Sequence, residues 1–154
     1  MGETVEIHDW HDLDAVRNGL DGDYILMNDL TPADDGYDDH ASETANDGKG
    51  WLPIGDDEDR FTGSFDGQGY TISDLYIDRP NTYYVGLFGY TDTDSVVENI
   101  GVVVNITGDG FFVGGLVGRN AGGVSDSYAT GNITGEGDYV AGLVGRNDGD
   151  VVDS

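Results

Sequence analysis

The stretch Gly115–Asn120 (GLVGRN) recurs unchanged as Gly142–Asn147, 27 positions later. A looser copy, Gly86–Gly89 (GLFG), lies 29 positions before Gly115. Three further features repeat at the shorter offset: Asn105–Gly108 as Asn132–Gly135, Gly110 as Gly137, and Val97 as Val124 and Val151. Agreement at several independent positions indicates a structural repeat rather than a chance match.

The repeat predicts short strands rather than helices. Its apolar runs, such as Val102–Val104, are only a few residues long and are separated by Gly, Asn or Asp. A unit of this size cannot bury an apolar face alone and has to stack on its neighbours. At roughly 3.3 Å per strand residue, one period suits one coil of two or three strands. We therefore predict an all-β fold, a right-handed parallel β-solenoid (β-helix) with coils of about 27 residues; the hand is that of the commoner solenoids.

The N-terminal segment differs from the repeats. Asp9–Gly19 predicts a short amphipathic helix that begins with a capping acid, ends at a stop glycine and carries Trp10, Leu13 and Val16 on one face. The open end of a solenoid exposes apolar core and unpaired strand edges, and this helix is suited to cover them. We assign residues 1–30 to an N-terminal cap that comprises a strand, the short helix and the first coil.

Two further regions follow the cap. Residues 31–50 are polar and acidic without periodicity, which predicts a loop insertion, and residues 51–154 are predicted to form the solenoid coils. Within these coils, Thr71–Ile77 matches Val96–Val102 in pattern. The last residues begin a coil that the sequence does not complete. We expect a truncated chain whose C-terminal end meets the remaining repeats or domains of a longer protein.

The charge balance is extreme: 31 acidic residues stand against 6 basic ones, a formal net charge of −25, and Lys49 is the single lysine. Such like charge destabilises a compact state at low ionic strength. At molar salt the Debye length falls to about 3 Å and the repulsion is screened. The balance is typical of halophilic proteins, above all haloarchaeal ones; the alternative is an ordinary acidic, calcium-binding secreted protein. It excludes nucleic-acid binding through a basic patch.

Composition excludes further classes. The sequence has no Cys, which rules out disulfides, Cys-based zinc sites and Cys nucleophiles. It has no apolar run near the roughly 20 residues of a transmembrane helix. Met1–Thr4 leads directly into a strand-like segment without a signal peptide, so the protein is intracellular, has lost its leader or is an excerpt.

The repeats resemble those of proteins that carry the GLUG motif, named for its Gly-Leu-any-Gly core. The matching segments are Gly86–Gly89, Gly115–Gly118 and Gly142–Gly145, with Trp51–Gly55, Phe61–Ile72 and Ser127–Gly131 around them. The resemblance implies a β-solenoid in a large surface or secreted protein of bacteria or archaea, including adhesin-like proteins and non-catalytic regions of surface peptidases. It implies no catalytic residue and no single ligand.

One candidate ligand face comes from the repeat itself. Arg119 and Asn120 should stack on Arg146 and Asn147 if one period makes one coil. Two stacked arginines can grip a sugar or a carboxylate. We favour the alternative, that they pair with nearby acids: Asp126, Asp148 or Asp150.

Other polar residues suggest modification or ion binding. Asn105 and Asn132 each begin an Asn-Ile-Thr sequon and are candidate glycosylation sites. The loop Asp34–Glu43 offers oxygen ligands suited to Ca²⁺, although it fits no EF-hand spacing. The histidines are not spaced as a zinc site, so we assign no metal ligand and no cofactor; they are His8, His11 and His40.

No catalytic residue stands out. Carboxylate pairs are plentiful, but nothing singles out two at the separation and protonation state that a glycosidase needs. We predict a non-catalytic structural or adhesive module of a halophilic protein at the cell surface or outside the cell, with glycans or other surface proteins as partners. The alternatives are a carbohydrate-binding face and a non-catalytic part of a polysaccharide-degrading enzyme or surface peptidase. A carbohydrate face would use the aromatic residues Tyr70, Tyr76, Tyr83, Tyr84, Phe111, Phe112, Tyr128 and Tyr139.

Folding is expected to require salt. The net charge of −25 opposes compaction until counter-ions screen it. Far-UV circular dichroism across a NaCl or KCl series should show the β signal strengthening up to molar concentrations. Equal stability in salt-free buffer would contradict the halophilic interpretation.

Overall fold

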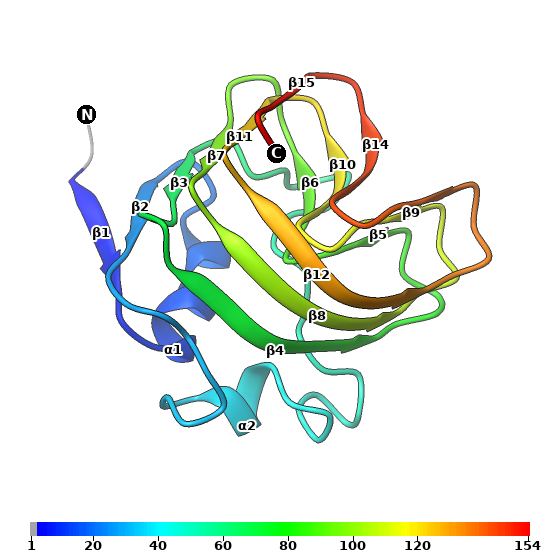
Figure 1. Cartoon of the computed structure of the whole chain (residues 1–154), viewed down its shortest axis with the longest axis horizontal. Coiled ribbons are helices and arrows are strands. Elements are labelled where there is room, and N and C mark those ends of the chain that lie inside the picture. The colour runs from blue at the N-terminus through cyan, green and yellow to red at the C-terminus, as the bar shows by residue number, and fades with distance from the viewer. Residues whose placement is uncertain (1–2) are drawn as a thin grey trace.

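The computed structural model describes residues 3–154, which form a parallel β-solenoid of about three coils (Figure 1). The N-terminal elements are β1 (Thr4–Ile7), α1 (Trp10–Asp14), the 3-10 turn η1 (Ala15–Asn18), β2 (Asp23–Leu26) and α2 (Tyr37–His40). The first regular coil contains β3 (Ser64–Asp66), β4 (Thr71–Asp78), β5 (Tyr84–Val85) and β6 (Phe88–Thr91). The next contains β7 (Val96–Glu98), β8 (Gly101–Thr107), β9 (Phe112–Val113) and β10 (Val117–Asn120). The last strands are β11 (Gly123–Ser125), β12 (Tyr128–Thr134), β13 (Tyr139–Val140), β14 (Val144–Asn147) and β15 (Asp150–Val152).

Successive coils stack in parallel. The order β1-β2-β3-β7-β11-β15 makes one long sheet, and three-stranded sheets run β4-β8-β12, β5-β9-β13 and β6-β10-β14. Val117 pairs with Val144 and Asn120 with Asn147, which confirms the parallel solenoid and its repeat offset of 27 residues. Each regular coil has four short strands rather than the two or three predicted, because bends and turns interrupt the chain between them.

The alignment of the earlier repeat differs from the sequence prediction. β4 pairs with β8, Thr71 lying beside Gly101 and Ile77 beside Ile106, so Thr71–Ile77 does not correspond to Val96–Val102. A bulge between Ile72 and Leu75 shifts the register by one residue. Asp74 in this bulge takes a left-handed φ of 58°. A bulge inserts one unpaired residue, which pattern matching without gaps cannot detect.

The core is a set of apolar rows that run along the solenoid axis. Phe65, Val97 and Val124 are neighbours in the long sheet, and each is buried. Ile77 and Ile106 continue one such row, and others are Val85 with Val113 and Phe88 with Val117. Each coil therefore hides its apolar residues against those of the coils beside it, as expected for a repeat that is too small to fold alone.

The predicted N-terminal helix is present. Asp9 caps α1 by accepting a hydrogen bond from the backbone N–H of Asp12 at 2.9 Å, and η1 extends the helix as a 3-10 turn that ends at Gly19. Trp10, Leu13 and Val16 are fully buried in the core. Within residues 3–154, no helix is long and apolar enough to cross a bilayer.

The acidic stretch 31–50 replaces one strand of an irregular first coil. Leu30 forms a bridge with Ile72, and Gly50 forms one with Ile77, so the chain departs beside one end of β4 and returns beside the other. The stretch is not loop throughout, because Tyr37–His40 forms the single helical turn α2, which lies against α1 in Figure 1.

Two equivalent glycines test this packing as a matched pair. A Cβ added to Gly115 would overlap the carbonyl oxygen of Gly142, whereas a Cβ on Gly142 meets nothing within 4 Å. Gly115→Ala is expected to lower the free energy of unfolding by about 1–3 kcal/mol. Gly142→Ala should leave it unchanged or raise it by up to about 1 kcal/mol, since alanine restricts the unfolded chain.

Urea unfolding at molar salt, followed by circular dichroism, measures both variants. Equal destabilisation by the two substitutions would show that the two glycines do not occupy the adjacent coil positions described above.

Candidate functional site

The four residues of the predicted ligand face lie on neighbouring strands. β10 and β14 pair so that Arg119 is beside Arg146 and Asn120 is beside Asn147. Successive residues of a strand point to opposite faces, so the two arginines lie on one face and the two asparagines on the other. The arginines lie on the outer side, and Asn120 points into the coil, where it is fully buried.

Asn120 belongs to an internal amide row. Its Oδ1 accepts from the Thr91 hydroxyl at 2.7 Å and from the backbone N–H of Gly122 at 3.2 Å. Its Nδ2 donates to Asn147 Oδ1 at 2.9 Å and to the Gly122 carbonyl at 3.1 Å. Asn147 repeats the turn bonds one coil on, with Gly149 as its partner. These asparagines stabilise the corner between two strands, and the Asn120 amide has no free group for a ligand.

Arg119 and Arg146 share one carboxylate. Arg119 Nε donates to Asp148 Oδ2 at 2.8 Å, and Arg146 Nε donates to Asp148 Oδ1 at 3.1 Å. The hydrogen bond from Arg119 lowers the pKa of Asp148 below its usual value, and the same bond raises the pKa of the Arg119 guanidinium. The structure thus brings together both predicted arginines and one of the three acids named as possible partners.

Aromatic rings flank the two arginines. Tyr84, Phe112 and Tyr139 stack along the axis with centroid separations of 5.2 and 5.1 Å and nearly parallel planes. The Arg119 guanidinium lies 5.5 Å from the Phe112 ring, and that of Arg146 lies 5.3 Å from Tyr139. Because the rings cover one another's faces, the stack offers a sugar mainly ring edges.

A second aromatic pair is more open. Tyr83 and Phe111 are 60% and 47% exposed, with ring centroids 5.2 Å apart. They border a hollow of about 420 Å³ whose other lining residues are Pro80, Asn81, Asp109, Gly110, Glu136, Gly137 and Asp138. Exposed aromatic surface beside polar groups is the surface chemistry that carbohydrate binding uses, and no sequence signal distinguished this pair from the stacked one.

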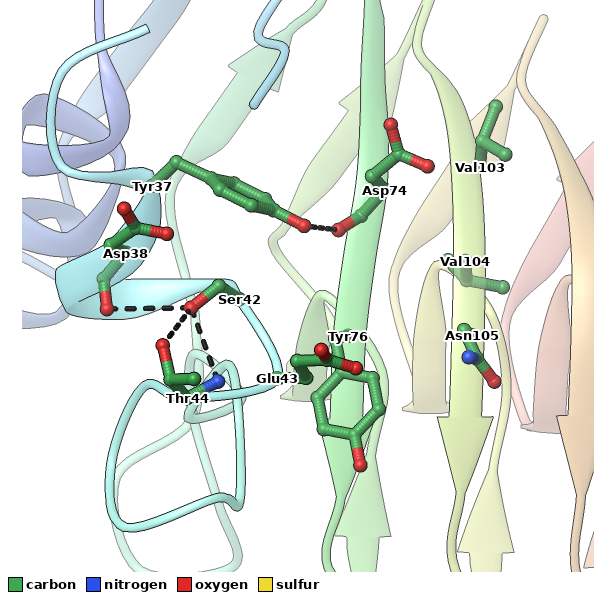
Figure 2. Close-up of a pocket in the computed structure, with 10 residues that line it drawn as sticks. All are labelled: Tyr37, Asp38, Ser42, Glu43, Thr44, Asp74, Tyr76, Val103, Val104 and Asn105. Atoms are coloured by element: carbon green, nitrogen blue, oxygen red, sulfur yellow. Dashed lines mark hydrogen bonds between the residues drawn. The ribbon is translucent and has the colours of Figure 1, made fainter. Parts of the chain in front are cut away.

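Another hollow lies between the acidic stretch and the sheet β4-β8 (Figure 2), with a volume of about 360 Å³. The Tyr37 hydroxyl donates to the backbone carbonyl of Asp74 at 2.8 Å, and the Ser42 hydroxyl lies 2.9 Å from that of Thr44. The hydroxyl groups of Tyr37, Ser42 and Thr44 are thus engaged within the protein. Asn105 lies at the margin of this hollow.

The carboxylates of the predicted calcium loop, Asp34–Glu43, are not gathered around one position. The carboxylate of Asp34 accepts bonds from the Thr31 backbone N–H at 2.8 Å and from its hydroxyl at 3.2 Å, which closes a turn. Asp38 and Asp39 lie on α2. Across residues 3–154, no three His, Cys, Asp or Glu side chains are grouped to hold a metal ion. Calcium binding at Asp34–Glu43 stays a prediction.

The two sequons lie on the sheet surface. Asn105 and Asn132 are paired residues of β8 and β12, and both are exposed together with their threonines. Glycosylation at either position stays a prediction.

The histidines are placed in a way that sequence spacing does not indicate. His11 and His40 lie 29 residues apart, yet their ring nitrogens approach to 3.0 Å. His8 is elsewhere, with its ring nitrogen 3.2 Å from Glu6. His11 and His40 come together only because the acidic stretch 31–50 folds against α1.

Comparisons with known proteins agree with the repeat analysis. Halomucin of Haloquadratum walsbyi is 46% identical over 90 residues, which is 56% of this chain and 1% of halomucin. A protein named as a Gly-rich membrane protein of Evansella cellulosilytica is 40% identical over 78 residues, 49% of this chain and 9% of that protein. The chain therefore spans a small part of both relatives. No solved structure matches it significantly.

A family model also matches directly. Residues 111–134, which run from β9 through β10 and β11 into β12, match the model of the GLUG motif. This segment includes the glycine corner at Gly114–Gly118 and the buried Asn120. The chain thus carries the GLUG motif, which confirms the resemblance found in its sequence.

Proposed function

We propose that this chain is a non-catalytic structural or adhesive module of a cell-surface or secreted protein from a halophile. One observation carries the proposal: the repeat's most distinctive polar residues are used between coils. Asn120 bonds to Asn147, and Arg119 and Arg146 both hold Asp148. A role in coil stacking explains why these residues recur from coil to coil, and no catalytic role is needed to explain it.

Two other observations support the setting. The chain is similar to part of halomucin and to part of a protein named as a membrane protein, which favours a surface location. The net charge of −25 with a single lysine favours a saline medium. Neither depends on the arrangement of the coils.

A carbohydrate-binding role is the second candidate, favoured by the exposed pair Tyr83 and Phe111 beside their polar hollow. Such a site would use the aromatic surface for contact and Asp109 or Glu136 for hydrogen bonds. It is compatible with an adhesive module, because a sugar-binding surface is one route to adhesion.

Location and activity can be tested with the same protein. Antibodies raised against the chain should label intact cells of the source organism at molar salt, or its culture medium, and brief external protease treatment should remove any cell label. A panel of polysaccharides incubated with the chain should release neither reducing ends nor unsaturated sugars. Label that appears only after lysis, or sugar release from any polysaccharide, would contradict the proposal.

The carbohydrate-binding role is tested by measuring how tightly the chain binds each polysaccharide of that panel. Tyr83→Ala and Phe111→Ala should each weaken binding by about fivefold if these rings contact a glycan, since aromatic contacts contribute about 1 kcal/mol. Val5→Ala, at an exposed apolar residue that does not border this hollow, is the control. No glycan retention by the wild-type chain would remove this second candidate and leave the structural role.

A further inference from the structure

We propose that His11 and His40 bind one divalent transition-metal cation, of the class of Zn²⁺, Cu²⁺ or Ni²⁺, which fastens α2 to α1. Nδ1 of His11 and Nε2 of His40 are hydrogen-bonded at 3.0 Å, with the rings at 88°. The inference rests on this local geometry and is independent of the proposed function.

The spacing of the two nitrogens is close to that of a shared ligand pair. Metal–nitrogen bonds of about 2.0–2.1 Å at a tetrahedral angle place two imidazole nitrogens roughly 3.3–3.4 Å apart. The observed 3.0 Å needs an adjustment of a few tenths of an ångström. The side chain of His11 is 53% exposed and is free to make it.

Each ring has a carboxylate on its outer side. Asp39 Oδ2 lies 3.9 Å from His11 Nε2, and Asp14 Oδ1 lies 3.7 Å from His40 Nδ1. Asp14 Oδ1 also accepts from Arg17 Nε at 2.8 Å. Negative charge on these sides favours protons on the outer nitrogens when a cation occupies the inner position. Without a metal, the inner nitrogens form one N–H···N hydrogen bond. A cation can take the place of the shared proton and bind both lone pairs, once the donor ring carries its proton on the outer nitrogen. A carboxylate behind each metal-bound histidine is the usual second layer of such sites.

Hydrogen bonds hold together the two elements that carry the histidines. The loop that leads to α2 is tied to α1, because Trp10 donates its backbone N–H to the Asp35 carbonyl at 3.0 Å and its indole N–H to the Thr31 carbonyl at 2.9 Å. Gly36, with φ of 88°, lies against the His11 ring, and a Cβ there would approach that ring to 3.0 Å. The glycine therefore gives the ring the space it occupies.

The chemistry of the pair selects the metal. Imidazole nitrogen suits Zn²⁺, Cu²⁺ and Ni²⁺, whereas Ca²⁺ and Mg²⁺ prefer oxygen. Because no third His, Cys, Asp or Glu joins the pair within the described residues, water would fill the remaining positions. Such a site exchanges its metal readily and adds a cross-link between α1 and the acidic stretch.

The test is a titration of the chelator-treated chain at molar salt, which screens diffuse binding to the acidic surface. Cu²⁺ quenching of tryptophan fluorescence reports the site, since Trp10 adjoins His11, and calorimetry with Zn²⁺ gives the stoichiometry. We expect one saturable site that excess Mg²⁺ does not displace. His11→Gln and His40→Gln should each weaken binding by about tenfold or more, and Asp39→Asn by about tenfold.

His8→Gln is the matched control, because it removes an exposed histidine that is paired with Glu6 instead. It should bind the metal as the wild type does. Zn²⁺ should raise the melting temperature of the wild type and of His8→Gln, but not that of His11→Gln or His40→Gln. Far-UV circular dichroism verifies folding, and His11→Gln alone decides the matter if His40→Gln unfolds. Unchanged binding in His11→Gln, equal loss in His8→Gln, or no saturable binding would overturn the proposal.

Discussion

The structure depends on in-register backbone hydrogen bonding between successive coils. The amide of Gly115 donates to the carbonyl of Gly142 at 2.9 Å, and that of Leu116 donates to the carbonyl of Leu143 at 3.0 Å. At Gly115 a Cβ would overlap the carbonyl oxygen of Gly142, so this position of the register requires a glycine. Once this register is set, residues of the last two repeats lie beside their equivalents, and their side chains have to be compatible with copies of themselves.

Residue types differ in how they tolerate such stacking. Apolar residues form buried rows, asparagine satisfies asparagine, and aromatic rings cover one another. Arginine does not tolerate its own copy, because two guanidinium groups repel. Asp148 resolves this conflict by accepting from Arg119 and Arg146 together. The acid-rich composition supplies such counter-charges, and salt screens the excess.

Features that recur in each repeat could be predicted from the sequence, whereas features that occur only once in the chain could not. The 27-residue offset correctly placed Arg119 beside Arg146, and helical periodicity located Trp10, Leu13 and Val16. It did not show that Asn120 points inward, because a strand only four residues long between glycine corners carries little alternation. The bulge at Asp74 was not predicted, because one inserted residue interrupts the repeat pattern. The pairing of His11 with His40 depends on how a non-repeating stretch folds back, for which the sequence has no periodic signal.

Disulfide trapping tests the register most directly, because the chain has no native cysteine. Thr107 and Thr134 are paired, exposed residues of β8 and β12, and adjacent strands bring such positions to about 4.8 Å, within reach of a disulfide. The account predicts that Thr107→Cys with Thr134→Cys forms an intramolecular bond on mild oxidation at molar salt, whereas Thr107→Cys with Asn132→Cys, two residues out of register, does not. Equal cross-linking of both pairs, or preference for the second, would contradict it.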